Sequence, residues 1–235
     1  MALYTIADLH LSFANPKPMD IFGTNWENHA EKIKKDWIEK VEDDDTVVIP
    51  GDISWAMTTE EAYPDFKFID ELPGKKIFLK GNHDYYWNTL TKLEEYIKEK
   101  NLKTIEFIHN NAKIYNKTIL AGTRGWNINS ECEDDIKIIN REAKRLELSI
   151  KYGIESFTDY DEIIVFMHYP PITNKKELND NVFFQVMKKY KIKRCFYGHL
   201  HGEAHKDAIE GNIDNISLKL ISADYLNFKL QKILD

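Results

Sequence analysis

The sequence predicts an α/β fold, because short β-rich apolar runs alternate with segments of helical periodicity along most of the chain. Several of the apolar runs end directly in polar side chains, as strands of an α/β sheet do at a ligand-binding edge. With 235 residues, 43% of them hydrophobic, the chain can bury a substantial core. No internal repeat, low-complexity tract or linker interrupts it. We therefore expect a single α/β domain over residues 1–235.

The first half of the chain alternates strands with helices. The apolar runs predict strands at residues 2–7, 46–49 and 77–79. Helical periodicity predicts one helix over residues 28–41 and another from about residue 90, with Asn88 or Thr89 as its N-cap. Residues 12–26 form the longest irregular connection, and loops of that length are often functional. Its residues Met19, Asp20 and Phe22 could cover a site or plug the fold.

The second half continues the alternation. Residues 105–122 predict three short strands joined by turns that contain Asn, and residues 136–150 predict a long helix with Ser130 and Glu133 as its capping box. Further strands are expected at 163–167 and 195–197, on either side of a helix over 182–190. The last two apolar runs, residues 216–222 and 228–234, predict a closing antiparallel pair.

The amino-acid composition indicates which partners and which cellular compartment to expect. The chain carries 32 Lys and Arg against 39 Asp and Glu, a formal charge of -7, which argues against a nucleic-acid partner. Two cysteines, Cys132 and Cys195, are too few for a disulfide framework, and Cys195 suits a small apolar core residue. The N-terminus lacks a basic leader, and the longest apolar run is far shorter than a membrane span. We therefore expect a cytoplasmic protein with no membrane partner.

Five apolar runs share one layout, in which metal-competent side chains follow the run at once. These side chains are Asp8 and His10, then Asp52, then Asn82, His83 and Asp84, then His168, and finally His199 and His201. Five of the eight histidines fall in these endings. Because the carboxyl ends of parallel strands converge on one edge of a sheet, the five endings could meet in space.

The residue types suit two metal ions. Asp8, His10 and His201 can hold one ion and Asn82, His168 and His199 another, with Asp52 as the bridging carboxylate. Mixed imidazole and carboxylate ligands without thiolate suit Mn, Fe, Zn or Co better than Mg or Ca. Two such ions, two aspartates and a bridging hydroxide leave a local charge of about +1, which attracts phosphate. An Asp in place of Asn82 would cancel that attraction.

These groups can hydrolyse a phosphate ester. Metal coordination lowers the pKa of bound water and so supplies a nucleophile for in-line attack on phosphorus. His83 is the candidate to give a proton to the leaving oxygen, with Asp84 orienting or polarising its ring. Arg124, flanked by glycine-containing turns, either binds a phosphate oxygen or is a surface residue. Five aromatic side chains either line a substrate cleft or belong to the core, and the sequence leaves both alternatives open. They are Trp55, Tyr85, Tyr86, Trp87 and Trp126.

The motifs "DLH", "GD", "GNHD", a histidine after a strand and "GHLH", in this order, resemble the calcineurin-like metallophosphoesterase superfamily. The resemblance implies a four-layer α-β-β-α sandwich with two mixed β-sheets. It also implies that His83 acts at the phosphate and that seven residues bind metal: Asp8, His10, Asp52, Asn82, His168, His199 and His201. The stretches "GDISWAM", "GTRGW", "HYPP" and "YGHLHG" are similar to a group of bacterial predicted phosphohydrolases within that superfamily.

The chain also departs from the protein Ser/Thr phosphatases of the superfamily. Leu11 stands where they have Gly, Ile53-Ser54-Trp55 replaces their Arg-Gly extension, and Asp84 stands where they have Glu. We therefore expect a phosphodiesterase or nucleotide phosphohydrolase with a small-molecule phosphate ester as substrate. The alternatives are a phosphomonoesterase, including a protein phosphatase, a nuclease, and a metal-binding scaffold without activity.

Overall fold

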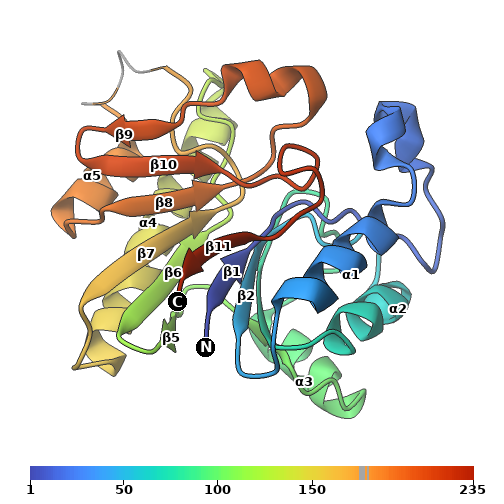
Figure 1. The fold of residues 1–235 in the computed structure, drawn as a ribbon. Coiled ribbons are helices and arrows are strands. Elements are labelled where there is room, and N and C mark those ends of the chain that lie inside the picture. Colours follow the sequence, from blue (N-terminus) through green and yellow to red (C-terminus); the bar gives the residue numbers. More distant parts are fainter. Residues whose placement is uncertain (175–177, 179) are drawn as a thin grey trace. The chain divides into compact units, whose positions relative to one another are not determined.

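The computed structural model describes residues 1–174, 178 and 180–235. The chain divides into two compact units, one formed by Met1–Phe107 with Ile221–Asp235 and the other by Ile108–Leu220. Each unit holds one β-sheet and its own helices (Figure 1). The single domain over residues 1–235 stays a prediction.

The first unit contains a five-stranded mixed sheet in the order β11-β1-β2-β3-β4. Its strands are β1 (Leu3–Thr5), β2 (Thr46–Pro50), β3 (Lys75–Leu79), β4 (Ile105–Phe107) and β11 (Gln231–Leu234). Strands β1 to β4 run parallel, and β11 pairs antiparallel with β1 at the edge. The parallel strands therefore all end at the same edge of this sheet.

Three helices of the first unit pack on one face of this sheet: α1 (His29–Lys40), α2 (Thr59–Asp70) and α3 (Leu90–Glu99). Trp37, Phe66 and Leu93 from these helices join strand residues Val47 and Phe78 in one core cluster. The N-cap of α3 is Thr89, whose hydroxyl accepts the N–H of Lys92, so one of the two predicted caps is confirmed. Helix α2 was not predicted.

The second unit contains a six-stranded mixed sheet in the order β5-β6-β7-β8-β10-β9. Its strands are β5 (Lys113–Tyr115), β6 (Thr118–Thr123), β7 (Glu162–Met167), β8 (Arg194–Tyr197), β9 (Gly211–Ile213) and β10 (Ile216–Leu220). The four central strands are parallel, and both edge strands are antiparallel. Its helices are α4 (Glu133–Ser156), α5 (Val182–Lys189) and the short 3₁₀ helix η4 (Gly202–Asp207).

Helix α4 lies close to strand β6 because Gly153 has no side chain. A Cβ at Gly153 would come within 2.5 Å of Cγ2 of Ile119. The apolar face of α4, with Leu146 and Ile150 fully buried, packs at this approach. The predicted α/β class with two mixed β-sheets is thus confirmed by the elements of the two units.

Two local predictions were wrong. The last two strands do not pair, because β10 pairs with β8 and β9, whereas β11 pairs with β1. The N-cap of α4 is Cys132 without a side-chain cap bond, so the Ser130 and Glu133 capping box is not formed. Instead, the Ser130 hydroxyl donates to a carboxylate oxygen of Asp135. No helix of the described residues is long and apolar enough to cross a membrane.

Candidate metal centre

The first unit places three predicted metal ligands directly after its first two strands. Asp8, His10 and Asp52 are buried, with exposed fractions of 0%, 3% and 1%. The Asp8 N–H donates to the carbonyl of Gly51 at 3.0 Å, and the His10 N–H donates to the carbonyl of Asp52 at 2.9 Å. The loops after β1 and β2 therefore run side by side. Asp8 and His10 offer ligand atoms within 4.8 Å of each other, and Nε2 of His10 lies 3.7 Å from Oδ2 of Asp52.

Four predicted ligands have left-handed backbone. The φ angles are 62° at Asp8, 48° at His10, 50° at Asp52 and 74° at His199. For a residue with a Cβ this conformation costs on the order of 1–3 kcal/mol, and it persists only where the surrounding structure imposes it. Such strain gathers at active sites and ligand-binding sites. Nine other non-glycine residues of the described chain also have positive φ, six of them Asn, so the backbone supports a functional role at these strand ends together with their burial.

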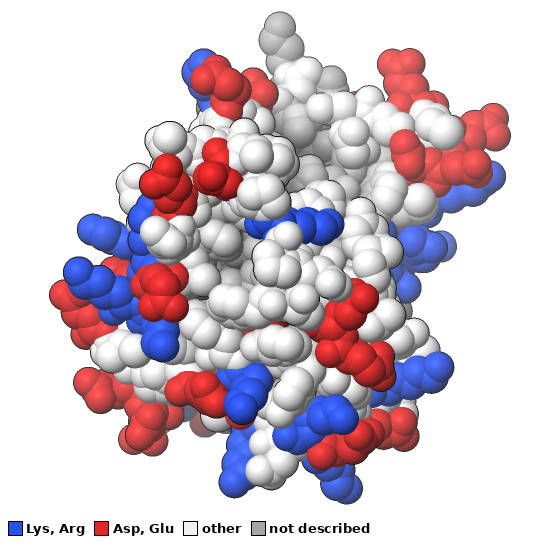
Figure 2. Space-filling model, turned by 90° about the vertical axis from the view of Figure 1, so that its right-hand side faces the viewer, with Lys and Arg blue, Asp and Glu red and all other residues white. Residues whose placement is uncertain are grey.

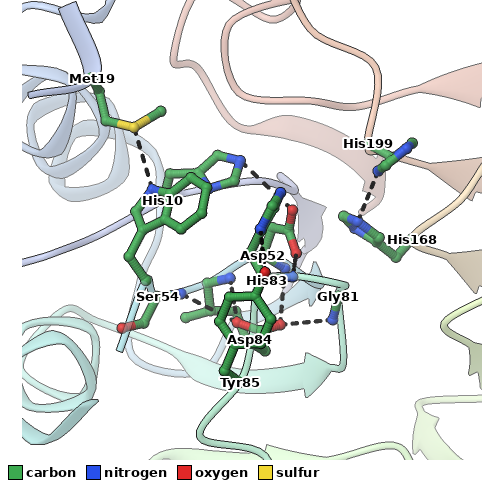
Figure 3. A network of polar contacts seen from close by, with 12 residues as sticks. His10, Met19, Asp52, Ser54, Gly81, His83, Asp84, Tyr85, His168 and His199 are labelled. Carbon is green, nitrogen blue, oxygen red and sulfur yellow. Dashed lines mark hydrogen bonds and ion pairs between the residues drawn. The ribbon is translucent and has the colours of Figure 1, made fainter. Parts of the chain in front are cut away.

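Asp84 connects the loops after β2 and β3 (Figure 3). Its Oδ2 accepts the backbone N–H groups of Asp52 at 2.9 Å and Gly81 at 2.7 Å. Its Oδ1 accepts those of Ile53 at 2.9 Å and Ser54 at 3.2 Å. Burial raises the pKa of this carboxyl, and the backbone N–H groups lower it in part. The carboxylate of Asp84 thus accepts backbone N–H groups of both loops, and the role that we predicted for it at the ring of His83 stays a prediction.

Gly81 allows the same two loops to approach closely. A Cβ at this position would lie 2.1 Å from Oδ1 and 2.2 Å from the backbone N of Asp52. The next residue along, Asn82, is half-buried, and the N–H of His83 donates to Oδ1 of Asp52 at 2.8 Å. The "GNHD" motif therefore has its Gly for steric reasons and its Asp for backbone hydrogen bonding.

The ring of His83 lies between aromatic side chains. Its centroid is 4.2 Å from that of Trp55, and its Nδ1 is 3.3 Å from Oη of Tyr85. Trp55 also stacks on His10 at 4.9 Å and donates its Nε1–H to Sδ of Met19 at 3.3 Å. Trp55 therefore links the long early loop, through Met19, to a predicted metal ligand and to the predicted proton donor.

The second unit holds the other three predicted histidine ligands. His168 directly follows β7 and is fully buried, and His199 follows β8 two residues after its end. Nε2 of His168 lies 3.2 Å from Nδ1 of His199, so the two rings could share one ion. The Gly198 N–H donates to the carbonyl of His168 at 3.0 Å and ties the two strand ends together. His201 is half-buried at the start of η4.

Arg124 directly follows β6 in the second unit. Its guanidinium lies over the ring of Trp126, 4.5 Å from the centroid, and its Nη2 is 3.8 Å from Oε1 of the buried Glu142. Burial lowers the pKa of Arg124 and Glu142 raises it, but an arginine stays charged at neutral pH. These contacts hold the guanidinium in place, and the phosphate-binding role predicted for it stays a prediction.

The five aromatic residues singled out in the sequence have different environments. Tyr86 and Trp87 belong to the core of the first unit, with 1% and 6% exposed, whereas Tyr85 is 51% exposed. Trp126 lines a cavity of the second unit with Tyr169 and Thr173, which the sequence did not single out. Tyr169 and Thr173 could have been found from the sequence, because they follow His168 in the segment after β7.

The donor set fits divalent transition metals. Carboxylates that are almost fully buried, such as those of Asp8 and Asp52, are paired or coordinate metal in proteins. Imidazole and carboxylate together suit Mn, Fe or Zn. Cys195 is fully buried in strand β8, where burial raises the pKa of its thiol, so it stays protonated within the core.

The family model of the calcineurin-like phosphoesterases matches residues 1–203, and this chain belongs to that family. The matched residues include every predicted metal ligand. Members of the family act on phosphate esters and typically bind divalent metals, and the described residues contain groups able to hold them. Membership thus confirms the superfamily that the sequence motifs resemble.

Two solved structures share the fold. A protein of unknown function from Aquifex aeolicus is 17% identical, with a TM-score of 0.51, over 98% of this chain and 95% of the other. The phosphopantetheinyl hydrolase of Mycobacterium tuberculosis is 12% identical, with a TM-score of 0.54, over 99% of this chain and 95% of the other. No curated protein matches the chain.

Proposed function

We propose that this protein hydrolyses phosphate esters with two divalent transition-metal ions, as a phosphodiesterase or nucleotide phosphohydrolase acting on a small substrate. The observation that carries the proposal is that buried or half-buried metal-competent side chains follow the strands of both units. Four of them also have left-handed backbone: Asp8, His10, Asp52 and His199. A chain tolerates such strain at several metal-competent residues where function requires it.

Seven residues are assigned as metal ligands. Asp8, His10 and His201 would hold one ion, Asn82, His168 and His199 the second, and Asp52 would bridge with its two carboxylate oxygens. The support for combining residues of the two units is the family, whose model spans all seven of them. When bound, the ions would lower the pKa of a coordinated water and neutralise charge on the phosphate.

The side chains of the chain itself have three tasks. His83 gives a proton to the leaving oxygen, and its place is fixed by its N–H bond to Asp52 and by the ring of Trp55. Asp84 positions the loops that carry Asp52 and His83 through its backbone bonds. Arg124 is charged and fixed over Trp126, and it stabilises the negative oxygens of the phosphate group.

The proposal is tested by metal analysis of the purified protein followed by two parallel assays. Hydrolysis of bis(p-nitrophenyl) phosphate and of p-nitrophenyl phosphate is measured with Mn, Zn, Fe or Mg added. We expect metal-dependent turnover, faster on the diester. A protein without metal-dependent turnover under all four conditions would be a binding scaffold, and the proposal would be wrong.

Two variants separate the assigned roles. His83→Ala should keep its metal and lose about 10²–10⁴-fold in kcat, because it removes only the proton donor. Asp52→Ala should lose metal. His109→Ala, outside the strand-end motifs, is the matched histidine control and should keep both metal and rate. Loss of metal in His83→Ala would show that the ring is a ligand instead.

The net charge of -7 favours a small substrate over nucleic acid. On the face shown in Figure 2, Lys and Arg are interspersed with Asp and Glu, and the described residues form no continuous basic stripe there. A nuclease needs such a stripe along the phosphate backbone. The assay panel therefore includes single-stranded DNA as the nuclease control. It also includes a phosphopantetheinyl ester, since one protein of the same fold is named a phosphopantetheinyl hydrolase.

A further inference from the structure

The second unit contains a cavity of about 510 Å³ at the ends of its parallel strands. Three loops and the end of η4 line it: residues 126–129 after β6, then Tyr169, Pro170 and Thr173 after β7, then His199 and Leu200 after β8, and Asp207 of η4. The volume falls in the range of about 300–1,000 Å³ that is typical of small-molecule sites. His199, which is assigned to metal binding, is one of the residues that line the cavity.

The aromatic wall of this cavity is held in place. Trp126 donates its Nε1–H to Oδ1 of Asp135 at 2.8 Å, and the guanidinium of Arg124 covers its ring. Tyr169 lies 5.6 Å from Trp126, centroid to centroid, and 4.0 Å from the ring of His199. The aromatic surface is therefore continuous from Trp126 to His199, and it is fixed before a ligand arrives.

The remaining wall offers neutral amide and hydroxyl groups and one carboxylate. The side chains of Asn127 and Asn129 are exposed, and the hydroxyl of Thr173 donates to Oδ1 of Asn129. Oδ1 of Asn127 accepts the N–H of Asn129 at 3.1 Å, which stiffens this loop. Asp207 adds a carboxylate to the lining, and this disfavours a second phosphate there. Neutral amides beside fixed aromatic rings suit an uncharged, planar group with hydrogen-bonding edges.

We propose that this cavity binds the organic group of the ester, and that this group is an uncharged heterocycle of nucleoside size. The proposal rests on the proposed function, because it takes the phosphate to lie beside His199. With the phosphate there, its substituent extends along Tyr169 and Trp126 and meets the amides of Asn127 and Asn129. The substrate class is then a nucleoside phosphate ester rather than a polyphosphate or a phosphoprotein.

Two diesters with the same charge and the same leaving group test this subsite. Thymidine 5′-(p-nitrophenyl phosphate) and methyl p-nitrophenyl phosphate differ only in the group that the cavity would receive. We expect kcat/KM to be roughly 10- to 100-fold higher for the thymidine ester. Equal values for the two esters would overturn the proposal.

Variants of the wall show whether the preference arises in this cavity. Asn129→Ala removes an exposed amide, and Trp126→Leu removes the aromatic surface; both should reduce the preference for the thymidine ester severalfold or more. Asn212→Ala, which removes an exposed Asn of strand β9, is the control and should leave the preference unchanged. A preference that persists in both wall variants would place nucleoside recognition elsewhere and overturn the proposal.

A binding measurement separates this proposal from the proposed function. Thymidine itself, which has no phosphate, should bind the wild-type protein in saturation-transfer NMR and bind Asn129→Ala and Trp126→Leu weakly. If neither diester is hydrolysed but thymidine shows this binding pattern, the subsite stands and the proposed function falls. If the diesters are hydrolysed and thymidine does not bind, the subsite proposal falls alone.

Discussion

The two units hold their predicted ligands in different ways. In the first unit the ligand loops are fixed through the backbone, since one carboxylate, that of Asp84, accepts N–H groups from both the loop after β2 and the loop after β3. In the second unit the histidines His168 and His199 contact each other and Tyr169 through their rings. Both units also use the other kind of contact, since Trp55 stacks on His10 in the first unit and the Gly198 N–H donates to the carbonyl of His168 in the second. The difference is the carboxylate of Asp84, which gathers several backbone N–H groups of the first unit, so the two units should respond differently to substitution.

The two units should respond differently because the loss of a shared hydrogen-bond acceptor and the loss of a ring contact cost different amounts of free energy. Loss of an acceptor that serves several buried N–H groups leaves each of them unsatisfied, at about 1–3 kcal/mol per group. Loss of a half-buried ring removes contacts that solvent partly replaces. We therefore expect substitutions in the first unit's loops to reduce both stability and metal content, whereas those at the second unit's half-buried histidines reduce metal content alone.

Asp84→Asn should have the largest effect on stability. An amide nitrogen in place of one carboxylate oxygen leaves two backbone N–H groups without an acceptor, at a cost of roughly 2–6 kcal/mol. The free energy of unfolding in urea and the metal content should both fall. Asp44→Asn, at an exposed aspartate of the same unit, is the control. Unchanged stability with a reduced rate would instead support the role at the His83 ring that we first predicted.

Gly81→Ala should have the second largest effect on stability. Its Cβ would overlap the carboxylate and the backbone N of Asp52, so the loops must separate, which we expect to cost about 1–3 kcal/mol and most of the bound metal. Gly211→Ala is the control, because a Cβ there meets nothing within 4 Å; its φ of 90° is positive, unlike that of Gly81, so any loss at Gly211 reports backbone strain without a steric contact. Metal analysis and urea unfolding of the two variants make the comparison. No loss of metal or stability in Gly81→Ala would show that the loops can accommodate a Cβ beside Asp52 and would contradict the steric role of Gly81.

Lys76, near the start of strand β3, should have a smaller effect on stability, and this effect should depend on pH. Its ammonium is buried and donates to the carbonyls of Asp70 and Leu72 and to the hydroxyl of Thr104, and burial lowers its pKa to about 8. Because the folded pKa lies below the ordinary value of 10.5, the protonated form is penalised in the folded state, and stability rises as the pH increases from about 8 towards 10.5.

Between pH 7 and pH 9 this stabilisation should reach about 1 kcal/mol relative to Lys76→Met. The measurement is the free energy of unfolding of both proteins at the two pH values. Lys75→Met, which removes the exposed neighbour on the same strand, should track the wild type. A difference between wild type and Lys76→Met that does not change with pH would contradict the lowered pKa.

His199→Asn should have the smallest effect on stability. Asparagine tolerates the left-handed backbone that His199 adopts, so the metal-free protein should change by less than about 1 kcal/mol while metal content falls. His205→Asn, nearby in η4 and outside the assigned ligands, is the control and should keep its metal. A large loss of metal-free stability in His199→Asn would remove the contrast between the two units.

Much of the candidate site could be predicted from the sequence because each ligand follows an apolar run at once. The runs before Asp8, Asp52 and His168 are strands β1, β2 and β7, and local composition sufficed to find them. Helix α2 escaped prediction, since its polar start and internal Pro64 obscure the periodicity of its apolar residues. The backbone bonds of Asp84 to Asp52, Ile53 and Ser54 also escaped prediction, because these three partners lie about 30 residues earlier in the chain.

The sequence by itself determined the alternation of strands and helices, the metal-competent residues at the strand ends and the family. These are local properties, encoded by composition and motif order within short segments. The tertiary structure decided which strands pair at the sheet edges, that Gly81 and Asp84 bring the loops of the first unit together, and that Trp126 and Tyr169 wall a cavity beside His199. Such features depend on contacts between residues far apart in the chain, and no local pattern encodes them.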